Sequence, residues 1–82
     1  MNSPEALAIS AEQLGQILKG VRKDLGLTQE KVGQKLGCHQ KEVSIMENRL
    51  ERTTVERLFR LLSALDLELV VRPRHTGLEE SW

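Results

Sequence analysis

A row of side chains that can donate or accept hydrogen bonds begins one short predicted helix, in the stretch HQKEVSIMENR at residues 39–49. At helical spacing Val43 and Met46 face inward, so the polar side chains of the first turn face out. Amide, imidazole, ammonium and hydroxyl groups can pair with the donors and acceptors of DNA bases in the major groove. An ordinary solvated helix can carry the same row. The outward side chains are those of His39, Gln40, Lys41 and Ser44.

Gln40 is the leading candidate for a base contact, because a glutamine amide can form two hydrogen bonds with adenine. His39 and Lys41 flank it, and each can donate to a guanine or to a phosphate. Ser44 lies one turn further on and is predicted to contact a base edge or a phosphate. No motif places a general base beside Ser44, so nucleophilic catalysis is not indicated. The alternatives are a solvated glutamine at Gln40 and an unremarkable exposed histidine at His39.

Candidate phosphate contacts lie on both sides of this row. Gln29 begins the preceding helix, where free backbone N–H groups and the helix dipole favour a phosphate. Its alternative role is a local hydrogen bond at the helix start, and the basic side chains can also be plain solvated charges. Phosphate contacts fix register and affinity but carry little sequence information. The basic candidates are Arg22, Lys23, Lys31, Arg49 and Arg52.

A first helix is predicted over residues 11–25. SAEQ at 10–13 has the form of a capping box, in which Ser10 accepts from an early backbone N–H and Gln13 reaches back. Gly26 is a suitable end, because glycine adopts the left-handed turn at little cost. The predicted apolar face consists of Leu14, Ile17, Val21 and Leu25.

The second helix is predicted to begin at the cap Thr28 and to end at Gly37, and the third covers about residues 39–47. Val32 and Leu36, four residues apart, form the inward side of the second helix. Gly33 lies in the middle of that helix, where glycine costs about 1 kcal/mol relative to alanine. This cost predicts a close approach of another helix at Gly33.

A fourth helix is predicted over residues 54–65, after a loop at 47–52. TTVE offers a capping box from Thr53 to Glu56. The leucines of this helix recur at helical spacing and form a broad apolar face. They are Leu58, Leu61, Leu62 and Leu65.

The period changes from helix to strand in LDLELVVR at residues 65–72, and Pro73 ends the alternation. A lone strand leaves backbone N–H and C=O groups unpaired, and the same strand of a second copy is the simplest partner. We therefore predict a homodimer joined by an antiparallel ribbon. The alternatives are a helix extension or a coil lying on its own domain. The strand residues expected to dimerise are Leu67, Leu69, Val70 and Val71.

Composition limits the class of protein. The 82 residues allow one domain with a modest core, and 12 basic residues balance 12 acidic ones. Positive charge concentrates from Lys19 to Lys41, which suits a nucleic-acid partner despite the neutral total. MNSPEALAIS has no features of a signal peptide, and no apolar run is long enough to cross a membrane. We expect a cytoplasmic protein that lies on the nucleoid when bound to DNA.

Cys38 is the single cysteine, so no internal disulfide can form. We interpret it as a buried space-filling residue rather than a redox or metal-binding group. No zinc-site spacing joins Cys38 to His39 or His75. No metal or other cofactor is expected.

The segment TQEKVGQKLGCHQKEVSIMEN resembles the helix-turn-helix of the Cro/repressor (XRE) class. That class has a glutamine at the start of the first motif helix (Gln29), a small residue at the helix crossing (Gly33) and a glycine in the turn (Gly37). A serine after the first inward residue of the recognition helix and a glutamate near its end match Ser44 and Glu47. The departure is Gly33, where alanine is usual, and it puts only local stability in doubt.

The likeness extends to the HipB group of antitoxins, through Glu47–Asn48, the threonine pair at 53–54, the leucine-rich helix, the hydrophobic strand and Trp82. It implies an all-α, lambda-repressor-like bundle of four to five helices with one C-terminal β-strand that pairs across a homodimer. It also implies repression at inverted-repeat operators of the chain's own promoter, and binding of a HipA-like kinase toxin. Trp82 is the expected toxin contact, although a chance terminal residue is the alternative.

The expected organisation is an N-terminal extension (1–9), a helix-turn-helix domain (10–66), a dimerising strand (67–73) and a flexible C-terminal tail (74–82). A second hypothesis is a protein-binding adaptor or toxin inhibitor with little specific DNA binding. The neutral total charge and Glu42 within the recognition helix favour that reading. An enzyme is not expected, because the sequence has no phosphate-binding loop, metal-ligand motif or activated nucleophile.

Overall fold

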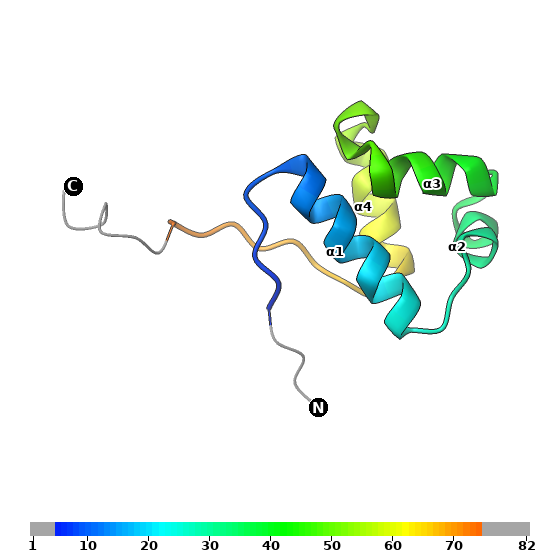
Figure 1. Ribbon diagram of the computed structural model, residues 1–82, viewed down its shortest axis with the longest axis horizontal. Coiled ribbons are helices and arrows are strands. Elements are labelled where there is room, and N and C mark those ends of the chain that lie inside the picture. The colour runs from blue at the N-terminus through cyan, green and yellow to red at the C-terminus, as the bar shows by residue number, and fades with distance from the viewer. Residues whose placement is uncertain (1–4, 75–82) are drawn as a thin grey trace.

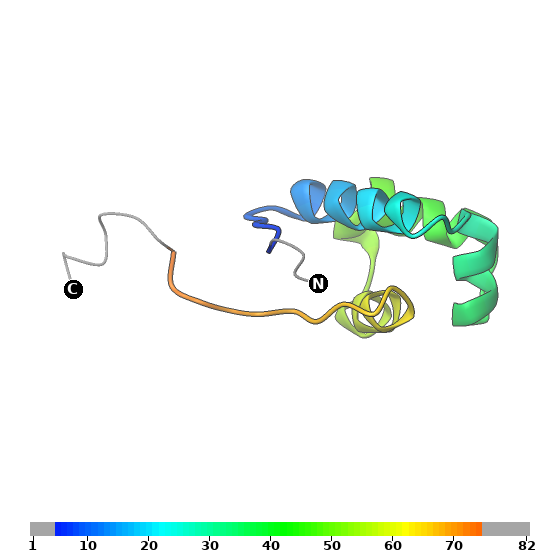
Figure 2. The same cartoon turned by 90° about the horizontal axis from the view of Figure 1, so that it is seen from below.

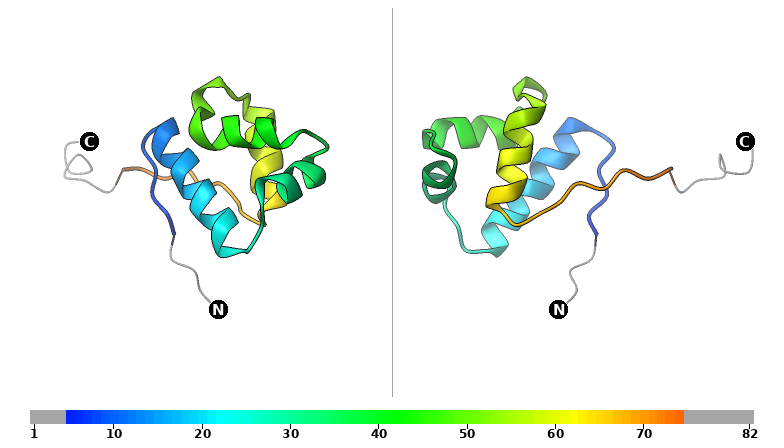
Figure 3. Two further views of the ribbon diagram at one scale, coloured as in Figure 1. Left: turned by 45° about the vertical axis from the view of Figure 1, so that its right-hand side comes forward. Right: turned by 180° about the vertical axis from the view of Figure 1, so that it is seen from behind.

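The computed structural model of the chain describes residues 5–74, and its regular elements are all helical (Figure 1). Seen from below, α1 and α3 form one layer, α4 crosses beneath it, and α2 stands at one end (Figure 2). In Figure 3, α4 lies behind α3 in the left view and in front of α3 in the right view. The helices are α1 (Ala11–Asp24), α2 (Gln29–Leu36), α3 (Gln40–Asn48), the 3₁₀ turn η1 (Leu50–Arg52) and α4 (Val55–Ala64).

The helix starts follow the predicted caps at two of three places. The Ser10 hydroxyl accepts from the Gln13 N–H at 3.0 Å, while the Gln13 side chain accepts from Ile9 N–H at 2.8 Å. The Thr28 hydroxyl accepts from the Lys31 N–H at 3.0 Å. Both caps satisfy backbone donors that the first helical turn leaves free.

The predicted cap of α4 is wrong by one residue. The Thr54 hydroxyl accepts from the Arg57 N–H at 3.2 Å. The N–H of Thr53 is instead bonded to Leu50 O at 2.9 Å and ends η1. The 3₁₀ turn, which the sequence interpretation treated as loop, therefore takes Thr53 and shifts the helix start to Val55.

The core lies between α1, the α2–α3 pair and α4. The predicted inward residues of α2 and α3 are buried, as are Leu61, Leu62 and Leu65 of α4. In α1 the buried leucine is Leu18, which the predicted apolar face omitted, whereas Leu25 is 53 % exposed. Each fully buried leucine or valine contributes about 1.5–3 kcal/mol of transfer free energy. The core residues are Leu18, Val32, Leu36, Val43, Met46, Leu50, Leu61, Leu62 and Leu65.

Two glycines allow close approach of backbone. A Cβ atom at Gly33 would lie 2.7 Å from the carbonyl oxygen of Cys38. The nearest neighbour is therefore the turn before α3, and the backbone nitrogen of Gln40, the first residue of α3, follows at 3.4 Å, so the predicted approach of another helix holds only for its first residue. A Cβ atom at Gly15 in α1 would lie 2.3 Å from the carbonyl oxygen of Glu47. That contact brings α1 against the end of α3.

The chain leaves α4 through a left-handed residue, Asp66, with φ of 59°. The N–H of Leu67 is bonded to Leu62 O at 2.8 Å, and that of Asp66 to Ser63 O at 3.1 Å. This pair of bonds is the Schellman arrangement, which ends a helix and turns the chain away. The helix extension considered for residues 66–71 is therefore absent.

Residues 67–74 run away from the helices without forming a strand in the described chain (Figure 1). Leu67 is partly buried against the core, whereas Leu69, Val70 and Val71 are 45 %, 62 % and 89 % exposed. Strand pairing needs a second strand, and a single copy offers none at this position. Trp82 and the rest of the predicted tail beyond residue 74 lie outside the described residues.

Candidate nucleic-acid interface

The turn between α2 and α3 is built by Gly37 and His39. Gly37 adopts a left-handed conformation, with φ of 73°, as the cap of α2. His39 caps α3, because its Nδ1 atom accepts from the Lys41 N–H at 3.0 Å. The helix therefore begins at Gln40, one residue later than predicted. Because Nδ1 is the acceptor, Nε2 carries the N–H of the neutral ring and is the group able to donate outward.

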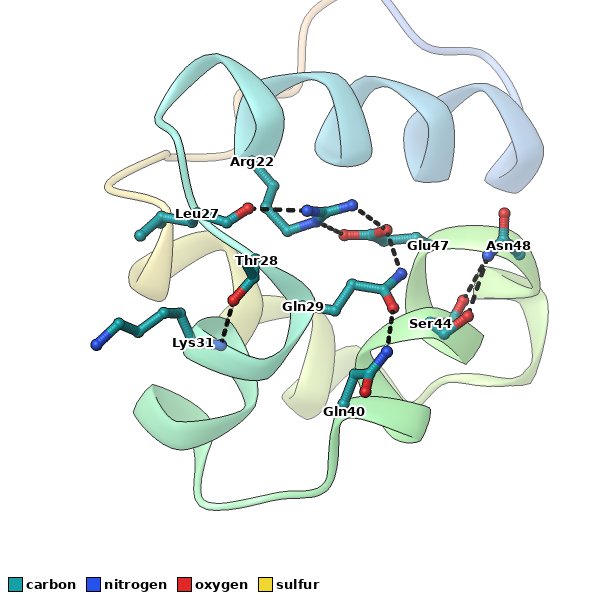
Figure 4. A network of polar contacts seen from close by, with 9 residues as sticks. All are labelled: Arg22, Leu27, Thr28, Gln29, Lys31, Gln40, Ser44, Glu47 and Asn48. Atoms are coloured by element: carbon teal, nitrogen blue, oxygen red, sulfur yellow. Dashed lines mark hydrogen bonds and ion pairs between the residues drawn. The ribbon is translucent and has the colours of Figure 1, made fainter.

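A chain of hydrogen bonds runs from a buried ion pair to the start of α3 (Figure 4). The Arg22 guanidinium donates to both Glu47 carboxylate oxygens, at 2.6 and 3.3 Å, and to Leu27 O at 2.8 Å. The Gln29 amide donates to Glu47 Oε1 at 3.0 Å. The Gln40 amide in turn donates to Gln29 Oε1 at 3.1 Å. Three helices thus meet in one polar network.

Arg22 departs from its predicted place at a phosphate. The residue is 7 % exposed, Glu47 is 2 % exposed, and the guanidinium is bonded on both edges. Either charge buried alone would carry a large desolvation penalty. Each charge is therefore tolerated in the interior only because the other is present. Arg22 is therefore a buried, fully engaged side chain and not an exposed group available to a phosphate. The sequence offered one signal for this, since Arg22 lies four residues after Leu18 on the buried side of α1.

Gln40 is held by this network at the start of α3. One N–H of the Gln40 side-chain amide donates to Gln29. Its second N–H and its Oε1 atom have no hydrogen-bond partner among the described residues. One free donor beside one free acceptor is the pair required by adenine. Gln29 therefore links Glu47 to Gln40, through contacts that are neither the local helix-start bond considered from the sequence nor a test of the predicted phosphate contact.

The other predicted base-contact residues flank Gln40. Lys41 is exposed, and Ser44 is half-buried. The Asn48 amide donates to Ser44 O at 2.9 Å and to Ser44 Oγ at 3.3 Å, so the hydroxyl is an acceptor there and keeps its own proton to donate. Ser44 and Asn48 follow Gln40 by four and eight residues, so they share its side of α3, whereas the neighbouring Lys41 is turned about 100° from Gln40.

The remaining basic candidates are all exposed: Lys23, Lys31, Arg49 and Arg52. Arg49 forms an exposed ion pair with Glu51 at 3.0 Å. The pKa of Glu51 is lowered by its own backbone N–H and then by the Arg49 side chain. Glu51 therefore stays ionised at neutral pH and pairs with the charge of Arg49.

Cys38 lies in the turn between α2 and α3. Cys38 is half-buried and packs against the core, in agreement with a space-filling role. Within residues 5–74, no three His, Cys, Asp or Glu side chains are grouped so that they could hold a metal ion. The same stretch includes no helix of the length and apolar character that crossing a membrane requires.

Two helices joined by a left-handed glycine turn, with the second exposing polar side chains from its first turn, define a helix-turn-helix DNA-binding domain. Comparison with known families supports this class, since the helix-turn-helix family HTH_3 matches residues 18–71.

The relatives are more specific. Antitoxin HipB of Escherichia coli (strain K12) is 34 % identical over 62 residues, which cover 76 % of this chain and 70 % of HipB. A solved HipB–O4 20mer complex has a HipB chain with a TM-score of 0.80 and 30 % identity, covering 85 % of this chain and 99 % of that one. A HipA–HipB–O2–O3 complex gives the same values.

The chain therefore belongs to the helix-turn-helix family of DNA-binding proteins and is homologous to HipB antitoxins. This family is not enzymatic, and the chain is no enzyme.

Proposed function

We propose that the chain is a sequence-specific transcriptional repressor that also serves as the antitoxin of a HipA-like kinase. The observation that supports DNA reading is the fixed position of the Gln40 side chain. The Arg22–Glu47–Gln29 network holds it with one donor and one acceptor free. A side chain fixed before binding loses less conformational entropy when it meets a base. The solved complexes of HipB with an O4 20mer and with HipA support the repressor and antitoxin roles.

In this proposal the first turn of α3 enters the major groove. Gln40 reads a base, with His39 Nε2, Lys41 and Ser44 at neighbouring positions. The N-terminus of α2 receives a phosphate through its free backbone N–H groups near Gln29. The basic side chains proposed to contact the backbone are Lys23, Lys31, Arg49 and Arg52.

Dimerisation is proposed through the segment 67–73. An apolar groove lies between α1, α4 and the two terminal segments, and Leu69 and Val70 line it together with Leu14, Leu58 and Leu62. Two copies related by a two-fold axis could pair their 67–73 segments antiparallel and cover both grooves. Two recognition helices would then lie about 34 Å, or a multiple of this, apart, which requires an inverted-repeat operator. The proposed domain limits stay at 1–9, 10–66, 67–73 and 74–82.

The adaptor hypothesis loses one of its supports. Glu42, the acidic residue within α3, forms an ion pair with Arg57 of α4. Its negative charge is thus compensated and directed away from Gln40, so it does not oppose DNA at the reading face. The partner of the antitoxin role is a HipA-like kinase, with Trp82 as the proposed contact.

The function is tested by selecting bound sequences from random duplex DNA and measuring the affinity of the winner against salt. We expect an enriched inverted repeat and a steep decline of affinity with salt, since each neutralised phosphate adds about −0.9 to the log–log slope. Weak binding to all duplexes without enrichment would contradict the proposed repressor function and favour the adaptor hypothesis.

Replacing Gln40 with alanine is expected to weaken binding to the selected duplex by about 1–3 kcal/mol and to relax the choice at one base pair per half-site. Binding to random duplex should change little, because the side chain contributes only where the base is right. The matched control is Gln34→Ala, which removes the same exposed side chain from α2 outside the network. Equal losses on both duplexes would rule out base reading by Gln40.

Replacing Leu69 with aspartate is expected to shift the chain from dimer to monomer in light scattering. The substitution puts a charge into the apolar groove that the second copy is proposed to cover, where an unpaired charge is strongly unfavourable. Ser63→Asp is the control, since it adds the same charge to an exposed residue outside the groove. If Leu69→Asp leaves the mass at that of the unsubstituted chain, the segment 67–73 does not join the dimer.

A further inference from the structure

Two arginines of α4 contact the helix-turn-helix from outside its reading face. Arg57 and Arg60 are three residues apart, so their side chains leave the same side of α4. Arg60 donates through Nη2 to the carbonyl oxygen of Leu36 at 2.7 Å. Arg57 donates through Nη2 to the carboxylate of Glu42. One helix thus reaches both helices of the motif.

The Arg60 contact lies at the end of α2. Leu36 is the last residue of that helix, and its carbonyl belongs to the final turn, which has no intrahelical donor. A positive charge at a helix C-terminus also interacts favourably with the helix dipole. Arg60 therefore caps α2 from a different helix, directly before the turn at residues 37–39.

The Arg57 contact lies at the beginning of α3, directly after the same turn. Glu42 is in the first turn of α3, where a carboxylate is favoured by the helix dipole. Glu42 follows Gln40 by two residues, so at 3.6 residues per turn their side chains project from nearly opposite sides of the helix. Arg57 therefore holds α3 from behind the face that carries Gln40.

We infer that Arg57 and Arg60 are positioning residues that fix the angle of α3 relative to α2, and so determine how accurately Gln40 meets its base. This inference rests on the proposed DNA-reading function. The two contacts bracket the turn, and between them the backbone of Cys38 already lies against Gly33. A turn held at its middle and at both ends permits little rotation of α3 as a rigid body.

The expected effect is on specificity more than on stability. The side chains of Arg57 and Glu42 are 46 % and 38 % exposed, and exposed ion pairs add little to folding free energy. Base reading, in contrast, depends on the donors and acceptors of α3 meeting fixed positions in the groove. Small changes in the tilt of α3 should therefore lower selected binding while the fold persists.

The test uses the double variant Arg57→Gln with Arg60→Gln in the full chain. Affinity is measured on the selected duplex and on a random duplex of the same length, over a range of salt. We expect the ratio of the two affinities to fall about tenfold, which is the loss that one impaired base contact typically produces. The salt slope should stay unchanged, because neither arginine is proposed to neutralise a phosphate.

Two control variants separate positioning from other roles. Glu56→Gln changes an exposed charged side chain of the same helix outside both arginine contacts, and should leave the ratio unchanged. Arg57→Lys with Arg60→Lys keeps both charges and should restore most of the ratio. Equal losses on both duplexes, with the slope reduced by about one per arginine, would make these residues phosphate contacts and overturn the inference. A lower Tm with an unchanged ratio would overturn it as well.

A measurement without DNA keeps this inference distinct from the proposed function. Amide hydrogen exchange at residues 40–43 should accelerate in the double variant, while exchange in α1 stays as in the unsubstituted chain. Unchanged exchange at residues 40–43 would overturn the inference that Arg57 and Arg60 position α3, even if the unsubstituted chain reads DNA. If exchange is faster in the double variant and the unsubstituted chain selects no DNA sequence, the proposed function is overturned instead.

Discussion

Replacing Glu47 with glutamine is expected to destabilise the folded chain by about 3–5 kcal/mol, because it leaves the Arg22 guanidinium buried without its counter-charge. Glutamine has nearly the same size as glutamate, so the change isolates the charge. Glu47 is 2 % exposed and Arg22 is 7 % exposed, so water cannot replace the lost partner. A chain of this size has a total stability of roughly 4–12 kcal/mol, so a large share of it would be lost.

Urea unfolding followed by circular dichroism measures this loss. The control is Glu51→Gln, which breaks an ion pair with Arg49 whose side chains are 55 % and 53 % exposed. Exposed pairs of this kind contribute about 0–1 kcal/mol. Should the two variants unfold at the same urea concentration, the Arg22–Glu47 pair would not be the buried, mutually dependent unit described above.

The same pair can be used to separate stability from DNA reading. Arg22→Met combined with Glu47→Leu removes both charges, and replacing a buried pair by apolar side chains is often neutral or stabilising. The doubly substituted chain should therefore regain the stability lost in Glu47→Gln. Leucine at position 47 offers the Gln29 amide no acceptor, so Gln40 would lose its anchored neighbour. We expect selected DNA binding to be weak in this variant although its stability is restored.

Local signals in the sequence were enough to predict the helices and the turn. Thr28 caps α2 and Gly37 ends it because capping and left-handed turns are decided by a few neighbouring residues. The inward positions of α2 and α3 follow from helical period alone. The mistake at Thr53 has the same origin, since two adjacent threonines both satisfy the capping pattern and only the 3₁₀ turn before them selects Thr54.

Contacts between distant segments could not be predicted in this way. Arg22 and Glu47 are 25 residues apart, and no local pattern joins an arginine of one helix to a glutamate of another. The bridging position of Gln29 depends on that pair, so its role also stayed open. The predicted strand at residues 67–73 is a different case, because the described chain forms no strand there and offers that segment no partner strand.

Gly15 is the clearest example of a residue whose importance appears only in three dimensions. In the sequence it is one glycine within a helical pattern, which indicates a weakened helix and no more. In the structure its missing Cβ lets α1 approach the backbone at the end of α3, where the carbonyl oxygen of Glu47 would lie 2.3 Å from an added Cβ atom. The same close approach of α1 and α3 determines how near Glu47 of α3 lies to Arg22 of α1.

Gly15→Ala is expected to destabilise the chain by about 3 kcal/mol, the upper part of the usual range for overpacking, because both the Cβ atom and its neighbour belong to rigid helix backbone. Gly20→Ala is the matched control in the same helix, where an added Cβ would meet nothing within 4 Å. There alanine should stabilise α1 by about 0.5–1 kcal/mol through helix propensity alone. Urea unfolding of the two variants should thus give shifts of opposite sign. A stabilising Gly15→Ala would show that α1 and α3 can separate freely, and the Arg22–Glu47 pair could then not depend on their close contact.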